Sequence, residues 1–153
     1  MGMHYSLYPM TASDVAALAD ARSLEMWERA RALRRPREMY MGSSWDLLLT
    51  LFKKLDPELR LAIMGREPRV DQGIDDIGYR YVDAGDVLEL AGRLQAISLE
   101  RIIEVYDPRG MTCAYHGDPS RHTFNVALHA WTFLVRSYQS LARSGDAGLI
   151  YIG

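Results

Sequence analysis

The clearest periodic pattern in the chain lies near its C-terminal end. Apolar side chains recur there at the three- and four-residue spacing of one helix face, from about residue 121 to residue 143. They are Phe124, Ala127, Leu128, Trp131, Leu134, Val135, Tyr138, Leu141 and Ala142. Gly145 follows at the position where a glycine often ends a helix. The pattern predicts one long amphipathic helix.

Shorter helices are predicted upstream, most of them after a residue that favours a helix start. Thr11, Asp83 and Ser98 each carry an oxygen that can accept a hydrogen bond from a first-turn N–H. Helical spacing or start signals place helices at about residues 11–19, 23–35, 44–55, 57–65, 83–94 and 98–106. The segment 44–55 is nearly all apolar, so we expect that helix to be buried on most sides.

Three short segments are typical of β-strands. They are Met3–Tyr8, Tyr79–Val82 and Leu149–Ile152. The segments 66–78 and 107–120 contain glycine, proline and aspartate, and we interpret them as loops. Because the strands do not alternate regularly with helices, we predict the α+β class. The expected fold is a predominantly helical single domain over residues 1–153, with a small sheet of N-terminal, central and C-terminal strands that brings the chain ends together.

Composition narrows the class of protein. The chain has 153 residues with 18 basic and 20 acidic side chains, and it lacks the overall positive charge of most nucleic-acid binders. No segment approaches the about 20 apolar residues of a membrane-spanning helix, and the first ten residues do not resemble a signal peptide. The single cysteine, Cys113, cannot form an internal disulfide. We therefore expect a cytoplasmic protein with no nucleic-acid or membrane partner.

An acidic segment in the first predicted loop is a candidate binding surface. Asp71, Asp75 and Asp76 precede Tyr79 and Arg80, and long loops often carry function. Without the spacing of an EF-hand, a calcium loop is not favoured. A solvated loop, a cation site and a basic partner surface all fit the charge pattern, and among the functional alternatives we favour a protein-binding loop.

A basic cluster lies in and after the second predicted helix. It consists of Arg29, Arg31, Arg34, Arg35 and Arg37. Such a cluster interleaved with aromatic side chains can bind nucleic acid, but few aromatic residues are near and Glu25, Glu28 and Glu38 dilute the charge. We favour a solvated helix face with pairs such as Glu25–Arg29 at i, i+4.

The histidines supply a second candidate metal site and a candidate enzyme site. His116, Asp118 and His122 lie within seven residues, and His129 follows His122 by seven positions on the long predicted helix. Imidazole and carboxylate can bind a divalent metal together, and two residues seven apart lie within about 20° around a helix axis. Polar residues without a ligand, or a histidine general base, fit the same positions. Nucleotide-binding, zinc-protease and serine-hydrolase motifs are not found, and no cofactor is predicted.

An ordered set of segments is similar to a known family. Met1-Gly2-Met3, Ser44-Trp45-Asp46 and Gly78-Tyr79-Arg80-Tyr81 are followed by a long helix with Trp131 and Tyr138, by Gly145-Asp146, and by a terminal apolar strand. Together they resemble the YfbM-like family of small bacterial proteins of unknown function, over nearly the whole chain. The resemblance implies a single α+β domain and brings no catalytic residues. It also implies a gene context near polymorphic-toxin loci for some members.

Two classes of function follow from these observations. The first is a non-enzymatic protein-binding module, specifically an immunity protein that neutralises a cognate toxin by direct binding. The second is a small enzyme or metal-dependent ligand binder that uses the histidine and aspartate residues above. A nucleic-acid face on the arginine cluster is a third, less favoured, interpretation.

Overall fold

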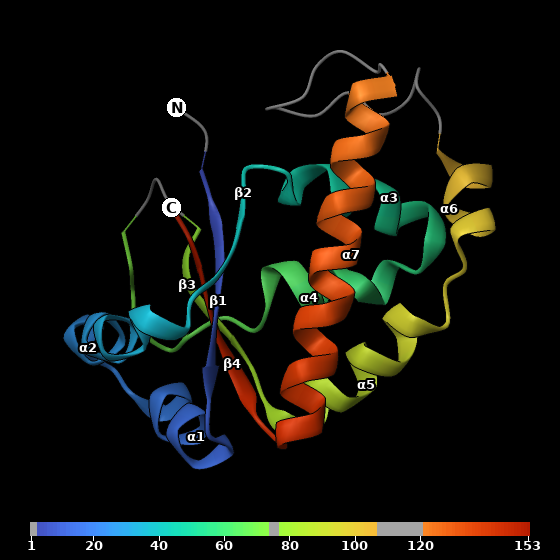
Figure 1. Ribbon diagram of the computed structural model, residues 1–153. Coiled ribbons are helices and arrows are strands. Elements are labelled where there is room, and N and C mark those ends of the chain that lie inside the picture. Colours follow the sequence, from blue (N-terminus) through green and yellow to red (C-terminus); the bar gives the residue numbers. More distant parts are fainter. Residues whose placement is uncertain (1–2, 74–76, 107–120) are drawn as a thin grey trace.

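The computed structural model describes residues 3–73, 77–106 and 121–153, and its helices and strands are shown in Figure 1. In chain order they are β1 (Tyr5–Met10), α1 (Ala12–Asp20), α2 (Leu24–Arg34), η1 (Arg35–Arg37), β2 (Met39–Gly42), α3 (Trp45–Leu55), η2 (Pro57–Leu59), α4 (Arg60–Met64), β3 (Gly78–Val82), α5 (Ala84–Gln95), α6 (Leu99–Val105), α7 (Arg121–Ser144) and β4 (Ala147–Ile152). The predicted α+β class, mainly helical, is confirmed. The loop predicted at 107–120 lies outside the described residues.

The strands form one antiparallel sheet in the order β2-β1-β4-β3. The first and last strands are its central pair, with Tyr5 opposite Ile152 and Met10 opposite Ala147. The sheet therefore places the two ends of the chain side by side, as predicted (Figure 1).

Two features of the sheet differ from the prediction. A fourth strand, β2, pairs with β1 at one edge, although three strands were expected. The strand β1 also continues through Pro9 to Met10 instead of ending at Tyr8. The reason is that β2 pairs only with Tyr5–Leu7, so Pro9 lies beyond that ladder, where a missing N–H is tolerated.

Helices cover both faces of the sheet and create two cores (Figure 1). One face packs against α3 to α7, and the other packs against α1 and α2. Because successive strand residues point to opposite faces, β1 contributes Tyr5 and Leu7 to the larger core and Tyr8 and Met10 to the smaller one. Among the described helices, none is both long and apolar enough to cross a bilayer.

Most of the predicted helix caps are present. Thr11 accepts from the N–H of Asp14 at 3.2 Å, and Ser98 accepts from that of Arg101 at 3.1 Å. Asp83 and Asp86 form a reciprocal capping box at the start of α5. Ser44 differs, because its hydroxyl donates to the Met41 carbonyl at 3.2 Å and does not cap α3.

Two buried tyrosines bind the same backbone carbonyl. The hydroxyls of Tyr5 in β1 and Tyr138 in α7 both donate to the Ala62 oxygen, at 3.0 Å and 2.7 Å. Ala62 lies in the last turn of the short helix α4, whose carbonyls lack helical partners. Burial raises the pKa of both tyrosines, so the hydroxyls remain donors at neutral pH. These bonds attach α4 to both the sheet and the long helix.

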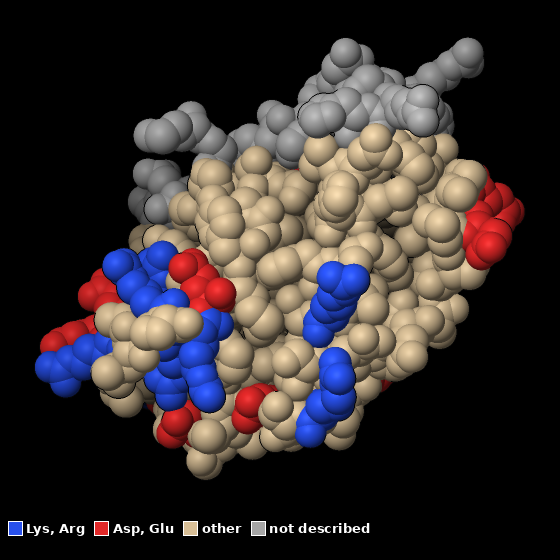
Figure 2. All heavy atoms as spheres, viewed as in Figure 1, with Lys and Arg blue, Asp and Glu red and all other residues tan. Residues whose placement is uncertain are grey.

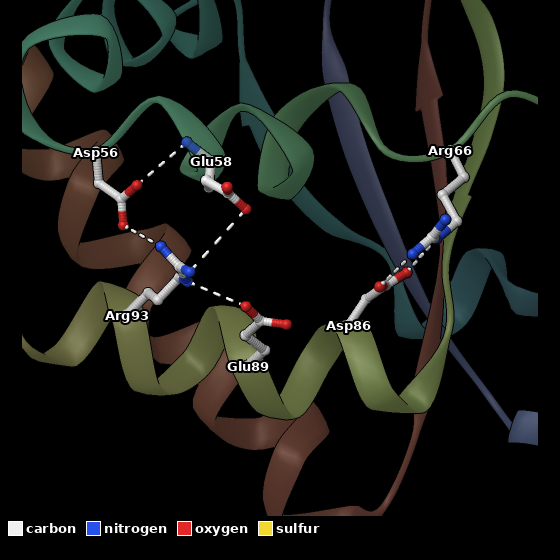
Figure 3. A network of polar contacts seen from close by, with 6 residues as sticks. All are labelled: Asp56, Glu58, Arg66, Asp86, Glu89 and Arg93. Carbon is white, nitrogen blue, oxygen red and sulfur yellow. Dashed lines mark hydrogen bonds and ion pairs between the residues drawn. The ribbon is translucent and has the colours of Figure 1, made fainter.

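Arginine–carboxylate contacts fix α5 at both of its ends (Figure 3). At the first turn, Arg66 binds both oxygens of Asp86, at 2.7 Å and 2.8 Å. Near the last turn, Arg93 contacts Asp56 at 2.9 Å and Glu89 at 3.2 Å. The bidentate pair adds geometric specificity, and the part-buried contact with Asp56 attaches the other end of α5, whereas the exposed contact with Glu89 lies within α5 and contributes little.

Candidate functional site

The described residues of the predicted acidic surface do not form one exposed face. Asp71 is exposed and accepts a hydrogen bond from the Gly73 N–H at 3.0 Å. Tyr79 is only 7% exposed and belongs to the smaller core. Arg80 lies next to it on β3, so it points to the opposite face of the sheet, where it contacts Glu67 at 3.3 Å. Asp75 and Asp76 lie outside the described residues.

The predicted metal residues are placed only in part. His116 and Asp118 lie outside the described residues, and His122 lies on α7 without a described side chain. His129 is exposed on the same helix. Within residues 3–73, 77–106 and 121–153, no three His, Cys, Asp or Glu side chains come close enough to hold a metal ion. The metal site stays a prediction.

The arginine cluster is divided among several structural contacts. Arg29 pairs with Glu25 at 2.9 Å, as the i, i+4 spacing predicted, and Arg34 pairs with Asp14 at 2.8 Å. These contacts agree with a solvated helix face.

Arg31 joins α2 to a group of tyrosines on the sheet. Its guanidinium carbon lies 3.6 Å from the centre of the Tyr151 ring, and its Nε donates to the Tyr8 hydroxyl at 3.0 Å. The Tyr8 hydroxyl in turn donates to Glu38 at 2.9 Å. Burial raises the pKa of Tyr8, against the opposing effect of Arg31. This group attaches α2 to the sheet, which is a structural role.

Two adjoining hollows follow the edge of the sheet between β2 and α7. One has a volume of about 360 Å³ and begins at Met39, and the other has a volume of about 220 Å³ and includes Tyr40 and Met41. His129 and Phe133 line both hollows, so the two lie next to each other along α7. We call this pair of hollows the β2–α7 groove. Its remaining lining residues are Ser44, Val126, Ala130, Thr132, Arg136, Ser137 and Ser140.

The groove combines an apolar floor with a wall that carries one arginine and one histidine. Met39, Met41 and Phe133 are partly buried against the larger core, whereas His129 and Arg136 are exposed. None of its lining residues is acidic. The sequence of α7 itself contains three arginines and two histidines but no aspartate or glutamate. Figure 2 shows basic side chains standing on a largely uncharged surface over this helix.

The helical side of this groove can be recognised in the sequence. Val126, His129, Phe133, Arg136 and Ser140 follow each other at helical spacing, beside the core stripe of α7, and they line one side of the groove. The other side of the groove is formed by the strand β2, which the sequence did not predict. Only His129 was a candidate before the structure.

A second hollow lies between α1 and α2. It has a volume of about 410 Å³ and is lined by apolar side chains that include Met26 and Leu33. Leu33 is 78% exposed. Unlike the β2–α7 groove, this hollow borders the ion pair of Arg34 with Asp14, so its rim carries both charges.

Comparisons with known proteins agree with the fold. Residues 1–151 match the family described as Domain of unknown function (DUF1877), and the chain belongs to this YfbM-like family. Among solved structures, the chain is similar to YfbM from Escherichia coli, described as a protein of unknown function. The two share 14% sequence identity with a TM-score of 0.72, over 99% of this chain and 100% of the other. No curated relative matches the sequence.

Proposed function

We propose that the protein is a non-enzymatic protein-binding module that holds its partner in the β2–α7 groove. The observation that carries this proposal is the pair of adjoining hollows, without acidic lining residues, beside the edge strand β2. Contiguous apolar surface with a polar rim is typical of protein interaction sites. The partner that we propose is a cognate bacterial toxin, and the module neutralises it by direct binding in the cytoplasm.

The shape and composition of the groove support binding more than catalysis. Methionine side chains adapt to different partners, and Met39 and Met41 line the strand side. Arginine and aromatic side chains supply most of the affinity in many interfaces, and Arg136, Phe133 and Tyr40 are available here. The alternative is a small enzyme or metal-dependent ligand binder, and the structure describes the side chain of only one of its four predicted residues, His129.

The test is whether the product of a neighbouring toxin gene binds at this groove. The purified full chain and that product are mixed, and the affinity is measured by calorimetry beside a growth assay of protection in cells. The wild-type chain is expected to bind and protect. The double variant His129→Glu, Arg136→Glu is expected to bind at least about tenfold more weakly, which corresponds to about 1.4 kcal/mol.

Arg143→Glu is the matched control. Arg143 lies on the same helix but lines a separate hollow with Ala91 and Gly92 of α5, away from β2. It reverses one arginine charge, as the Arg136→Glu part of the double variant does, and because it lies outside the groove it is expected to leave binding unchanged. Equal loss in both proteins, or full binding by the double variant, would contradict the placement of the partner in the groove. Absence of any toxin bound by the wild-type chain would contradict the immunity function.

A further inference from the structure

We infer that the groove receives an extended, acidic segment of the partner, which adds to the sheet as a fifth strand beside β2. This inference rests on the proposed function and names the chemistry of the partner. It follows from three features of the groove: a free strand edge, its length, and the distribution of charge along α7.

The free edge is the first feature. β2 is the terminal strand of the sheet, and in the described part of the chain only β1 pairs with it. A terminal strand presents backbone N–H and C=O groups to which another extended chain can pair. The strand Met39–Gly42 carries no charged residue and no proline, which are two of the devices that block such pairing.

The length of the groove suits a short segment. Its helical wall runs from Val126 to Ser140, and the fourteen helical rises of about 1.5 Å between these residues correspond to about 21 Å. An extended chain rises about 3.4 Å per residue, so about six residues fit along the groove. A segment of this size uses the whole hollow and pairs with all of β2.

The side chains of such a segment would meet two different surfaces. In an extended chain, alternate side chains point in opposite directions. One set would enter the hollow between Met41 and Phe133, which favours apolar residues. Arg136 and His129 line the groove, Glu38 directly precedes β2, and α7 has no acidic residue to oppose an acidic segment. The expected ligand therefore mixes apolar and acidic residues.

A displayed library of random nine-residue peptides, selected on the full-length protein, tests the inference even when the natural partner is unidentified. Synthetic copies of the selected peptides are then measured by fluorescence anisotropy. We expect the selected sequences to be acidic, and their affinity to fall as salt rises. We expect Arg136→Glu to weaken binding at least about tenfold and Arg143→Glu to change it less than about twofold.

Two measurements separate strand addition from other modes of binding. Hydrogen exchange of the β2 amides is expected to slow when the peptide binds. Two versions of the peptide are compared, one methylated at the odd-numbered backbone nitrogens and one at the even-numbered nitrogens. Only one of the two phases is expected to abolish binding, because only one set of N–H groups faces β2.

Each other outcome has a defined meaning. Selected peptides that are neutral or basic, that protect the hollow between α1 and α2, or that tolerate methylation in both phases overturn the inference. So does a selection that yields no binder. Peptides that need Arg136 but tolerate methylation in both phases overturn the inference but leave the proposed function intact, since the groove still binds a partner. A toxin that binds at the groove in the calorimetric test would also leave the proposed function intact.

Discussion

At the scale of single residues, the Asp86 carboxylate joins the start of α5 to Arg66, which follows α4. It accepts from the N–H of Asp83 at 3.1 Å. It also accepts from two nitrogens of Arg66 (Figure 3). Burial acts to raise its pKa, but the bonds from Arg66 and from the Asp83 backbone outweigh burial and lower it. The carboxylate is thus more stable in the folded protein than in the unfolded chain.

We predict that Asp86→Asn destabilises the fold by about 1–2 kcal/mol at neutral pH, because it removes the charge from a bidentate pair. A lowered pKa stabilises the fold above the unfolded value of about 3.9, and this contribution is lost as pH falls through the folded value. The difference between variant and wild type should therefore shrink as pH falls below about 3.9 and through the lower folded value. Urea unfolding at neutral pH and at a series of acidic pH values measures it.

Glu89→Gln on the same helix is the control for this prediction. Glu89 makes an exposed contact with Arg93 at 3.2 Å, so the same change from carboxylate to amide should cost less than about 0.5 kcal/mol. If Asp86→Asn costs no more than the control, or if its cost does not depend on pH, the role given to the Asp86 charge is wrong.

At the scale of elements, glycines at the end and in the middle of a helix have opposite effects. Gly145 has a φ of 68°, and the N–H groups of Gly145 and Asp146 bind the carbonyls of Ala142 and Leu141 to end α7. Gly92 lies inside α5 with an ordinary helical backbone. A methyl group at either position meets no atom within 4 Å, so only backbone conformation distinguishes them.

We predict that Gly145→Ala lowers the free energy of unfolding by about 1 kcal/mol and that Gly92→Ala raises it by about 0.5–1 kcal/mol. Thermal and urea unfolding of the two variants measure this pair of changes. Equal shifts in the same direction would show that backbone conformation does not control stability at these positions.

Elements with strong local signals were predictable, and those that depend on pairing were not. The helix at 83–94 combined a capping pair with apolar spacing, and the helix at 121–143 had a long apolar stripe. The strand β2 has only four residues, and it is held by β1, 30 residues or more away in sequence. The strand β2 forms the second wall of the groove. Because the sequence does not reveal this strand, it does not reveal the position of the groove either.

Contacts with distant segments also explain why the predicted acidic surface does not form one exposed face. Tyr79 and Arg80 were correctly expected in a strand, but adjacent strand residues face opposite sides of a sheet. The burial of Tyr79 depends on Trp27, whose ring centre lies 6.0 Å from its own, and on Tyr151 at 4.9 Å. Both contacts come from distant segments, so sequence spacing alone does not reveal that burial.

At the scale of the whole molecule, the sheet joins the two cores into one structure (Figure 1). The paired strands β1 and β4 place side chains in both cores, so neither core is complete if these two strands separate. The helices α1 and α2 therefore cannot lose their packing surface without disturbing the strands that also support α7. Single domains of this size usually unfold in one cooperative step.

We predict that both cores unfold together, and the three tryptophans allow a direct test. Trp27 lies in the smaller core, whereas Trp45 and Trp131 lie in the larger one. In the variant Trp45→Phe, Trp131→Phe, fluorescence reports on the smaller core alone, and far-ultraviolet circular dichroism reports on helices of both layers. The two urea transitions of this one protein should share a midpoint. A fluorescence change at lower urea would mean that α1 and α2 separate first, and the sheet would then be a boundary between two units of different stability.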